Sequence, residues 1–545
     1  MTTSRLLICA YLCSSAAGLF AQSELADVHV AAKQVNGGPY ARTNPPRGGR
    51  YELGNASMLD LVRIAYAFDA DKILGGPSWL EMNRYDLTIQ VPANATADSA
   101  NVILQSVLAD RFKLVVRKDS KPLPTWVLTA GKKPLMKEAN GEGETGCHPH
   151  TEAPAAPGSG AGQLMMMSAD GKVTVISFGP GQTIQYTCHN VTMEAFAGAL
   201  RGMIGNSVAS NAIDETGIKG TWNFDLKYSF NFAMIGGTGD DRISFPDAVE
   251  KQLGLKLEQR PLPTQVMIVD SVEAKPSPNP PGVAEALPPT RVPTEFDVAD
   301  IKLSDPDTRF GRYQNQPGGR FVSTGMNVAS VINNALQVQS NDQIIGMPKF
   351  ADSMRYDITA KATVEPGANL DSDSTAPLVL ALLKDRFGLK YHTEERALPA
   401  YSLISVKPKM KKADPASRAS CKTQNAPAPA PPGSVDMTCH NITMAQFTEQ
   451  LSMYGNNMSI QPLDSTGLEG GWDFTLTWNR RAGMNMGPAR PAEGSGDAPA
   501  AASDPNGGYT IFEAVEKQLG LKLEQQKRPV PVYVIDQLNE KPTDN

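Results

Sequence analysis

One ten-residue segment occurs twice in the chain and constrains every other inference about its fold. Residues 250–259 read EKQLGLKLEQ, and the same ten letters return at residues 516–525. Ten matched residues do not recur by chance within one polypeptide, so the segment indicates a tandem duplication. The 545 residues are therefore expected to form two copies of one fold.

The repeated segment also predicts its own local structure. In the second copy, Thr510 and Glu513 have the T-x-x-E spacing of a capping box, which marks the start of a helix. Apolar residues follow at helical spacing until Gly520, which stands where a helix ends in the left-handed conformation. Residues 521–524 then alternate between apolar and charged side chains, as a strand does. We expect each copy to close with a helix, a glycine stop and a strand.

Other matched segments extend the duplication over most of the chain. They pair residues 48–51 with 318–321, 84–86 with 355–357, 110–112 with 385–387, and 187–190 with 438–441. We predict copy 1 at residues 25–275 and copy 2 at residues 294–541. The intervening residues 276–293 are rich in proline, which favours a semi-rigid extended linker.

A weaker repeat lies inside each copy. A helix, a glycine turn and an aromatic strand are predicted at residues 57–68, 75–77 and 85–87, and again at 192–201, 216–217 and 222–224. We therefore expect an α+β fold with four related α-β-α-β units, two per copy, whose helices pack on mostly antiparallel or mixed sheets. This order of elements resembles the small periplasmic N-domains of secretins.

The N-terminus predicts export. Residues 1–21 contain Arg5, a short apolar run and small residues up to Ala21, the pattern of a signal peptide cleaved after Ala21. No later segment is apolar over about 18 residues, so we expect a soluble periplasmic or secreted protein without a transmembrane segment. The net charge of −6 is dispersed along the chain and gives no nucleic-acid footprint.

Several of these segments resemble a known family. Residues 76–79, 84–86, 110–112, 296–299, 464–470 and 534–536 together look like the soil-associated acidobacterial family of secreted proteins. The resemblance covers nearly all of the mature chain, although the family usually has one such domain where this chain has two. Because the family's function is unknown, the resemblance implies an exported protein and transfers no catalytic residue. Some relatives follow a membrane metallopeptidase-type sensor, but this chain has no His-Glu-x-x-His motif.

Four cysteines follow the predicted signal peptide, two in each copy. Even, symmetric cysteines in an exported chain favour disulfides. A zinc site is the alternative in copy 1, where His148, His150 and His189 stand near the two cysteines, but copy 2 keeps only His440. We predict the bonds Cys147–Cys188 and Cys421–Cys439, each closing a low-complexity insertion at residues 141–162 or 426–433. A third such insertion is predicted at 484–506.

Other charged motifs have mainly structural interpretations. Asp214 and Asp464 stand in Asp-x-Thr-Gly segments, which predict turns more readily than an aspartic-protease pair. Asp270 and Asp536 end hydrophobic strands without a nucleophile or base at a defined spacing. The Arg-Tyr-Asp and Asp-Arg-Phe motifs at residues 84–86 and 110–112 predict buried or half-buried Arg–Asp pairs that tie helix to sheet, with ligand contact as the alternative.

The sequence gives no catalytic constellation: serine elbows, phosphate-binding loops and Cys-x-x-Cys pairs are missing. We therefore predict an exported, non-catalytic module that binds an envelope protein, a peptide or a glycan, with no cofactor and no metal. The alternative is a hydrolase whose site is assembled between repeat units. A shallow apolar sheet edge or groove would favour binding, whereas a pocket between the copies lined by acids of shifted pKa would favour the enzyme.

Overall fold

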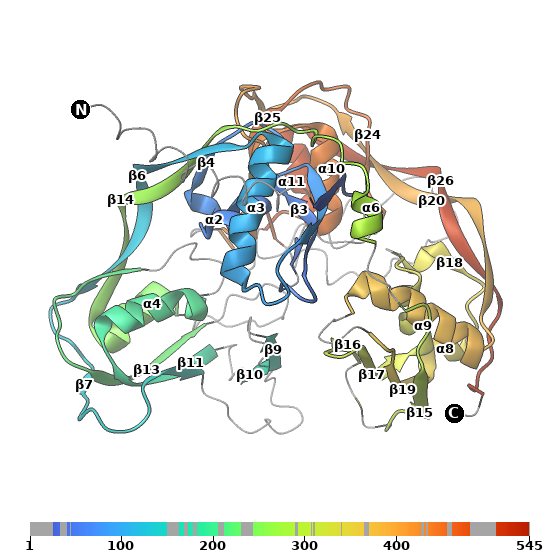
Figure 1. Ribbon diagram of the computed structural model, residues 1–545, viewed down its shortest axis with the longest axis horizontal. Coiled ribbons are helices and arrows are strands. Elements are labelled where there is room, and N and C mark those ends of the chain that lie inside the picture. The colour runs from blue at the N-terminus through green and yellow to red at the C-terminus, as the bar shows by residue number, and fades with distance from the viewer. Residues whose placement is uncertain are drawn as a thin grey trace, which may run out of the picture.

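Among the residues that the structure describes, six of the seven sheets form two equivalent sets of three, as a duplication requires (Figure 1). The computed structural model describes residues 25–32, 41–43, 45–149, 163–167, 173–177, 183–204, 212–229, 243–288, 293–306, 308, 311–338, 340–364, 370–426, 430–431, 434–454, 460–479 and 508–543. The predicted signal peptide and the predicted insertion at residues 484–506 lie outside these residues. The expected α+β fold is confirmed, with three four-stranded sheets in each copy.

The first unit of copy 1, called unit 1a, places two helices against an antiparallel sheet. The sheet has the order β1-β5-β3-β2, and helix α2 starts with a capping box between Ser57 and Asp60. The elements are β1 (Ala26–Val30), β2 (Arg42–Thr43), β3 (Arg50–Ser57), α2 (Met58–Tyr66), the 3-10 turn η1 (Ala70–Lys72), β5 (Arg84–Gln90) and α3 (Ala97–Phe112).

Unit 1b repeats this plan later in the copy. Its sheet has the order β7-β13-β11-β8, and a separate two-stranded sheet, β9 (Gln163–Met167) with β10 (Val173–Ser177), precedes β11 in the chain. The predicted insertion at residues 141–162 is therefore in part a strand, because β8 lies inside it. The unit contains β7 (Lys137–Glu138), β8 (Gly146–Pro149), β11 (Thr183–Val191), α4 (Met193–Ile204), β13 (Trp222–Ser229), α5 (Phe245–Ala248) and the π-helical turn η3 (Val249–Leu253).

A long two-stranded ribbon joins the two units. It consists of β6 (Val115–Ala130) and the antiparallel β14 (Leu255–Ser271), and Leu123 lies opposite Leu262 at its centre. Short strands extend it at both ends, in the order β12-β6-β14-β4. The strand β4 (Ile73–Gly75) of unit 1a pairs with β14, whereas β12 (Ile213–Glu215) of unit 1b pairs with β6. Each unit therefore adds its short strand to the long strand that the other unit provides.

The ribbon contributes side chains to both hydrophobic interiors. Met267 and Val269, near the end of β14, are buried in the interior of unit 1a. Leu255 and Leu257, at the start of the same strand, are buried in the interior of unit 1b together with Leu128 of β6. The two units share this ribbon, so neither interior is built from one continuous segment.

Copy 2 has the same three sheets and the same exchange. Unit 2a contains β15 (Val298–Leu303), β16 (Arg312–Gln316), β17 (Arg320–Asn327), α7 (Val328–Ala335), the 3-10 turn η4 (Asn341–Gln343), α8 (Phe350–Ser353), β19 (Arg355–Lys361) and α9 (Ser372–Arg386). The ribbon consists of β20 (Lys390–Ser405) and β26 (Leu521–Gln537), flanked by β18 (Ile344–Ile345) and β24 (Leu463–Asp464). Unit 2b contains β21 (Lys411–Lys412), β22 (Ser420–Asn425), β23 (Ser434–Ile442), α10 (Met444–Tyr454), β25 (Trp472–Asn479), α11 (Ile511–Ala514) and the π-helical turn η6 (Val515–Leu519).

The repeated segment has the predicted order of helix, glycine and strand. Thr510 and Glu513 form the capping box, and Gly520 ends the helix at φ 67° before β26 begins. The helix differs from the expectation in its winding, because its second half is π-helical in both copies. The N–H of Gly520 reaches the carbonyls of both Val515 and Glu516 in this wider turn.

The two matched tryptophans occupy equivalent, half-buried sites. Trp222 packs against the interior of unit 1b and Trp472 against that of unit 2b. The duplication predicts equivalent buried sites for the two side chains; the sites are equivalent, but each side chain is only half-buried. Leu253 and Leu519, the other matched pair, are fully buried as expected.

Trp472→Ala is expected to lower the free energy of unfolding by about 2 kcal/mol, less than the ~3–5 kcal/mol of a fully buried aromatic residue. Part of this loss is the contact with Lys412, whose Nζ lies 4.6 Å from the ring centroid. Urea denaturation of the full chain measures the effect, and Trp222→Ala is the matched control with a similar expected loss. A midpoint unchanged by Trp472→Ala would contradict the packing described.

The predicted linker packs on copy 1. We call residues 276–288 the strap. Arg111 is 3% exposed and donates to the carbonyls of Ala26 and Ser277 and to Oδ1 of Asn279. Further along, the short helix α6 (Val283–Ala286) lies against β1. This use of Arg111 corrects the expected Arg–Asp pair, since Asp110 is largely exposed. The domain boundaries stay predictions.

Units 1a and 2b meet in the middle of the molecule, with 1b and 2a on opposite sides (Figure 1). Ala419 donates its N–H to the carbonyl of Ser78 at 2.9 Å, and Met82 packs against the interior of unit 2b. A second contact joins Arg42 of unit 1a to Asp373 at the start of α9 in unit 2a, at 2.6 Å. Within the described residues, no helix is long and apolar enough to cross a membrane.

Candidate functional site

The asparagine of the Thr-Cys-His-Asn motif occupies a bulge position that recurs in all four units. In copy 2, Asn441 stands at φ 48° in a β-bulge and donates its N–H to Oδ1 of Asp473 at 2.9 Å. A side chain from the neighbouring strand accepts the N–H of the bulge residue in every unit: Asn55 to Asp86, Asn190 to Asn223, Gly325 to Asp357 and Asn441 to Asp473. This shared hydrogen bond supports the prediction of four related units. It also shows that the asparagine of the motif stabilises the backbone of the bulge.

Both cysteine pairs form disulfides between neighbouring strands. Cys147 of β8 is bonded to Cys188 of β11, and Cys421 of β22 to Cys439 of β23. In each pair the two residues face each other directly across the antiparallel ladder, with Cα atoms 4.0 and 4.1 Å apart. These are the two pairs that the sequence predicts. Because Cys147 and Cys188 are bonded to each other, neither offers a free thiolate to the alternative zinc site of copy 1. His150, another candidate ligand of that site, lies outside the described residues.

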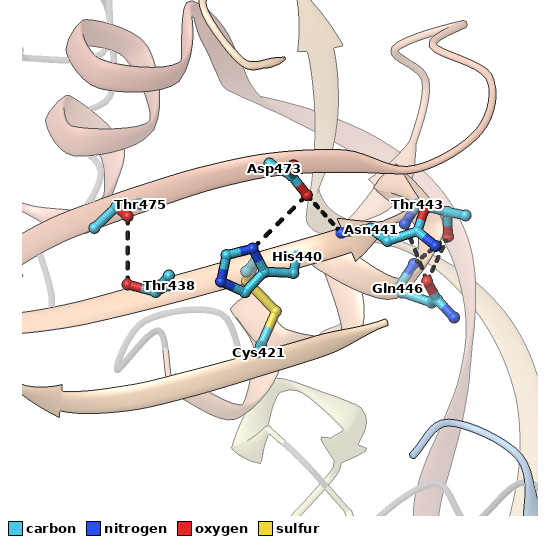
Figure 2. Close-up of a disulfide and its surroundings, with 9 residues drawn as sticks. Cys421, Thr438, His440, Asn441, Thr443, Gln446, Asp473 and Thr475 are labelled. Atoms are coloured by element: carbon cyan, nitrogen blue, oxygen red, sulfur yellow. Dashed lines mark hydrogen bonds and ion pairs between the residues drawn. A yellow bond between two sulfur atoms is a disulfide. The ribbon is translucent and has the colours of Figure 1, made fainter. Parts of the chain in front are cut away.

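Polar side chains lie beside the disulfide of copy 2 (Figure 2). Thr438, His440 and Asp473 are among them and have the residue types of a catalytic triad, but not its geometry. Nδ1 of His440 is 3.8 Å from Oδ1 of Asp473, too far for a hydrogen bond, and the histidine side chain is 59% exposed. The hydroxyl of Thr438 interacts with that of Thr475 at 3.3 Å. In copy 1 the acid is replaced by Asn223. The arrangement does not activate a hydroxyl, so we assign it no reaction.

The acids singled out in the sequence have structural partners. Asp214 accepts the N–H of Thr216 at 2.8 Å, and Asp464 makes the equivalent turn, so the turn prediction is confirmed. The strand-end acids have exposed partners: Asp270 forms an ion pair with Arg117 at 3.1 Å, and Asp536 lies 2.9 Å from Nδ1 of His392. Arg84 ties helix to sheet as expected, although its partner is Asp60 of α2 at 3.2 Å.

The contact between units 1a and 2b contains a largely buried ion pair. Nε of Arg418 lies 2.7 Å from Oε1 of Glu81, and both side chains are less than one-fifth exposed. Arg418 also donates to the carbonyl of Ile73 at 2.8 Å. Counting back from the matched cysteine, copy 1 has Glu144 where copy 2 has Arg418, and Asp352 of unit 2a stands where unit 1a has Glu81. The same contact between 2a and 1b would therefore oppose two carboxylates.

Glu81→Gln should change how stability depends on pH. Burial raises the pKa of Glu81 above its ordinary value of 4.5, while Arg418 and Lys422 act in the opposite direction. The folded chain thus holds this proton more tightly than the unfolded chain. Glu81's contribution to the free energy of unfolding is greatest below its unfolded pKa and falls as the pH rises through the raised folded pKa. Urea denaturation from about pH 4 to about pH 7 should show the wild type losing stability relative to Glu81→Gln; a constant or rising difference would contradict this.

An open cup lies on the outer face of the unit 2a sheet. Its volume is about 570 Å³. Val298, Lys361 and Arg320 stand in one row across three neighbouring strands, β15, β19 and β17. The remaining lining comes from Ala299, Asp300, Pro317, Gly318, Thr359 and Ala360. The cup therefore combines an edge strand, an apolar side chain that is 64% exposed and two cations.

The two cations of the cup have no side-chain partner in the part of the chain that the structure describes. Neither the guanidinium of Arg320 nor the ammonium of Lys361 makes a hydrogen bond or ion pair there. Burial of a carbonyl or carboxylate against them would give charge-assisted hydrogen bonds. This site was not predicted from the sequence. The matched Gly-Gly-Arg-aromatic segments at residues 48–51 and 318–321 could have indicated it, because they place an arginine directly after a turn in both copies.

Comparison with known proteins identifies one related group. A protein-family model described as "Protein of unknown function (DUF3738)" matches residues 59–272 and again residues 329–538. The two matches cover most of the chain and fall one in each copy, which supports the tandem duplication. No curated protein and no solved structure matches the chain.

Proposed function

The chain belongs to the DUF3738 family of proteins of unknown function, and from this premise we propose that it is an exported, non-catalytic binding module of the periplasm or cell envelope. Two disulfides support export, because such bonds persist in oxidising compartments. The association with soil acidobacteria belongs to the same proposal and rests on the sequence resemblance alone.

The cup of unit 2a is the observation that carries the proposal. It is shallow, open and placed at a sheet edge, and its lining mixes apolar side chains with Arg320 and Lys361. Sites of this kind hold an extended segment of a partner through its backbone and a few side chains. The predicted partner remains an envelope protein, a peptide or a glycan.

No specific observation among the described residues favours the hydrolase alternative. The aspartates at strand ends are in turns or in exposed contacts with Arg117 and His392. Glu81, the acid whose burial raises its pKa, lies between the copies, but it is paired with Arg418 in a packed contact. A perturbed pKa marks a functional site when the group faces a cleft, and Glu81 serves the contact between units.

Site-specific photo-crosslinking tests the proposal. A photoreactive phenylalanine analogue at Thr359, in the cup, should form an adduct with an envelope component that Lys361→Glu abolishes. The same analogue at Thr88, the equivalent position of copy 1, is the matched control and should not form that adduct. Absence of any Lys361-dependent adduct, together with turnover in a broad hydrolase screen, would overturn the proposal.

A further inference from the structure

We propose that the cup of unit 2a binds a proline-rich peptide with the chemistry of residues 280–288, the part of the strap that contacts the equivalent arginine of copy 1. This inference rests on the proposed binding function and names its ligand class. It follows from comparing the same sheet face in the two copies: the strap contacts this face at Arg50 in copy 1, whereas the face is an open cup in copy 2.

The two faces correspond residue by residue. Arg50 lies opposite Gln90 in unit 1a, and Arg320 lies opposite Lys361 at the same register of unit 2a. The matched Gly-Gly-Arg segments place both arginines directly after the turn that forms one rim of the cup. An arginine on the outer face is thus common to both copies, and its surroundings differ.

In copy 1 the end of the strap is held by this arginine. Nη1 of Arg50 donates to the carbonyl of Pro288 at 2.7 Å. Helix α6 lies against β1, and Val283 and Leu287 are only 2% and 4% exposed although neither belongs to the interior of a unit. Beyond the contacts of Arg111 with Ser277 and Asn279, this end of the strap is therefore held through the carbonyl of Pro288 and has two buried apolar side chains on successive turns.

In copy 2 the corresponding groups are exposed. Val298 is 64% exposed, whereas Leu25 at its position in copy 1 is half-buried. Arg320 and Thr359 are exposed, whereas Arg50 and Thr88 are half-buried. The cup thus offers an arginine donor like the one that holds Pro288 in copy 1, together with an exposed apolar side chain. The prolines that flank α6, at residues 280, 281 and 288, restrict the conformations of the free segment, which lowers the entropy cost of binding it.

Fluorescence anisotropy with a labelled peptide of residues 280–289 tests the inference on the full chain. In copy 1 the strap is tethered at an effective concentration in the millimolar range, so the free peptide should bind at concentrations up to about 1 mM. Arg320→Ala removes a charge-assisted hydrogen bond and should weaken binding about tenfold. Arg50→Ala, the matched substitution in copy 1, should leave the affinity unchanged. A peptide carrying Val283→Asp and Leu287→Asp should not bind.

Three outcomes would overturn the inference: no binding at about 1 mM peptide, binding unaffected by Arg320→Ala, or equal binding of the doubly substituted peptide. Because Arg320 is exposed, an unchanged urea midpoint verifies that its alanine variant is folded. Failure of this inference is separable from failure of the proposed function. A Lys361-dependent crosslink from Thr359 with no peptide binding would retain the binding module and reject the proline-rich ligand.

Discussion

Replacing Arg418 with alanine is expected to lower the free energy of unfolding by about 3 kcal/mol, because it leaves a buried carboxylate without its partner. Arg418 is the basic side chain that meets Glu81 between units 1a and 2b, and it also binds the carbonyl of Ile73. Both interactions are lost in the alanine variant. Urea denaturation of the full chain at neutral pH, followed by tryptophan fluorescence and circular dichroism, measures the loss.

A matched variant in copy 1 and a double variant serve as controls for Arg418→Ala. Glu144→Ala changes the equivalent, exposed position of copy 1 and should alter stability by less than about 0.5 kcal/mol. The double substitution Glu81→Met with Arg418→Met removes both charges together and should recover most of the loss, since apolar pairs often replace buried ion pairs without cost. An Arg418→Ala variant as stable as the wild type would show that the two copies are not held by this contact.

Removing the disulfide of copy 1 with Cys147→Ala and Cys188→Ala is expected to cost about 4 kcal/mol, and removing that of copy 2 about 3 kcal/mol. The difference arises because the first bond joins residues 41 apart in sequence and the second joins residues 18 apart. A longer closed segment restricts the unfolded chain more. Replacing both cysteines of a pair avoids a free thiol, and reduced wild-type protein provides the control for cavities at Cys188 and Cys439, which are fully buried.

The two disulfide variants should also differ from each other in stability. Both should be less stable than the oxidised wild type, with the copy 1 variant unfolding at the lower urea concentration. Mass mapping of the unreduced wild type should recover the peptides of Cys147 with Cys188 and of Cys421 with Cys439. Losses below about 1 kcal/mol in both variants would contradict the entropic account of these bonds.

Local features of the fold could be predicted from the sequence because their causes lie within a few residues. The capping box of Thr510 and Glu513 and the glycine stop at Gly520 depend on neighbouring side chains and on one left-handed backbone position. The cysteine pairs could be predicted because each copy supplied a comparison for the other. The π-helical half of the closing helix has no such local signature, and nothing in the structure explains it.

Features that depend on distant partners could not be predicted. The pairing of β4 with β14 joins residues nearly 200 positions apart, and periodicity says nothing about which strands meet. The sequence shows that copy 2 has Arg418 where copy 1 has Glu144. It does not show that Glu81 is the partner of Arg418, because that contact depends on how units 1a and 2b pack. The cup depends equally on the strap, because a proline-rich composition does not say which surface the segment will cover.

The shared ribbon also fixes the time at which the protein can fold during synthesis. A nascent chain of 250 residues contains all the strands and helices of unit 1a. Met267 and Val269 of β14, which belong to the interior of this unit, have not yet been made. Non-local pairing of this kind delays folding until the last strand arrives. The first unit, although encoded first, therefore matures together with the second, when β14 emerges. Copy 2 repeats the delay, since Ile535 of β26 completes the interior of unit 2a only after unit 2b has been made.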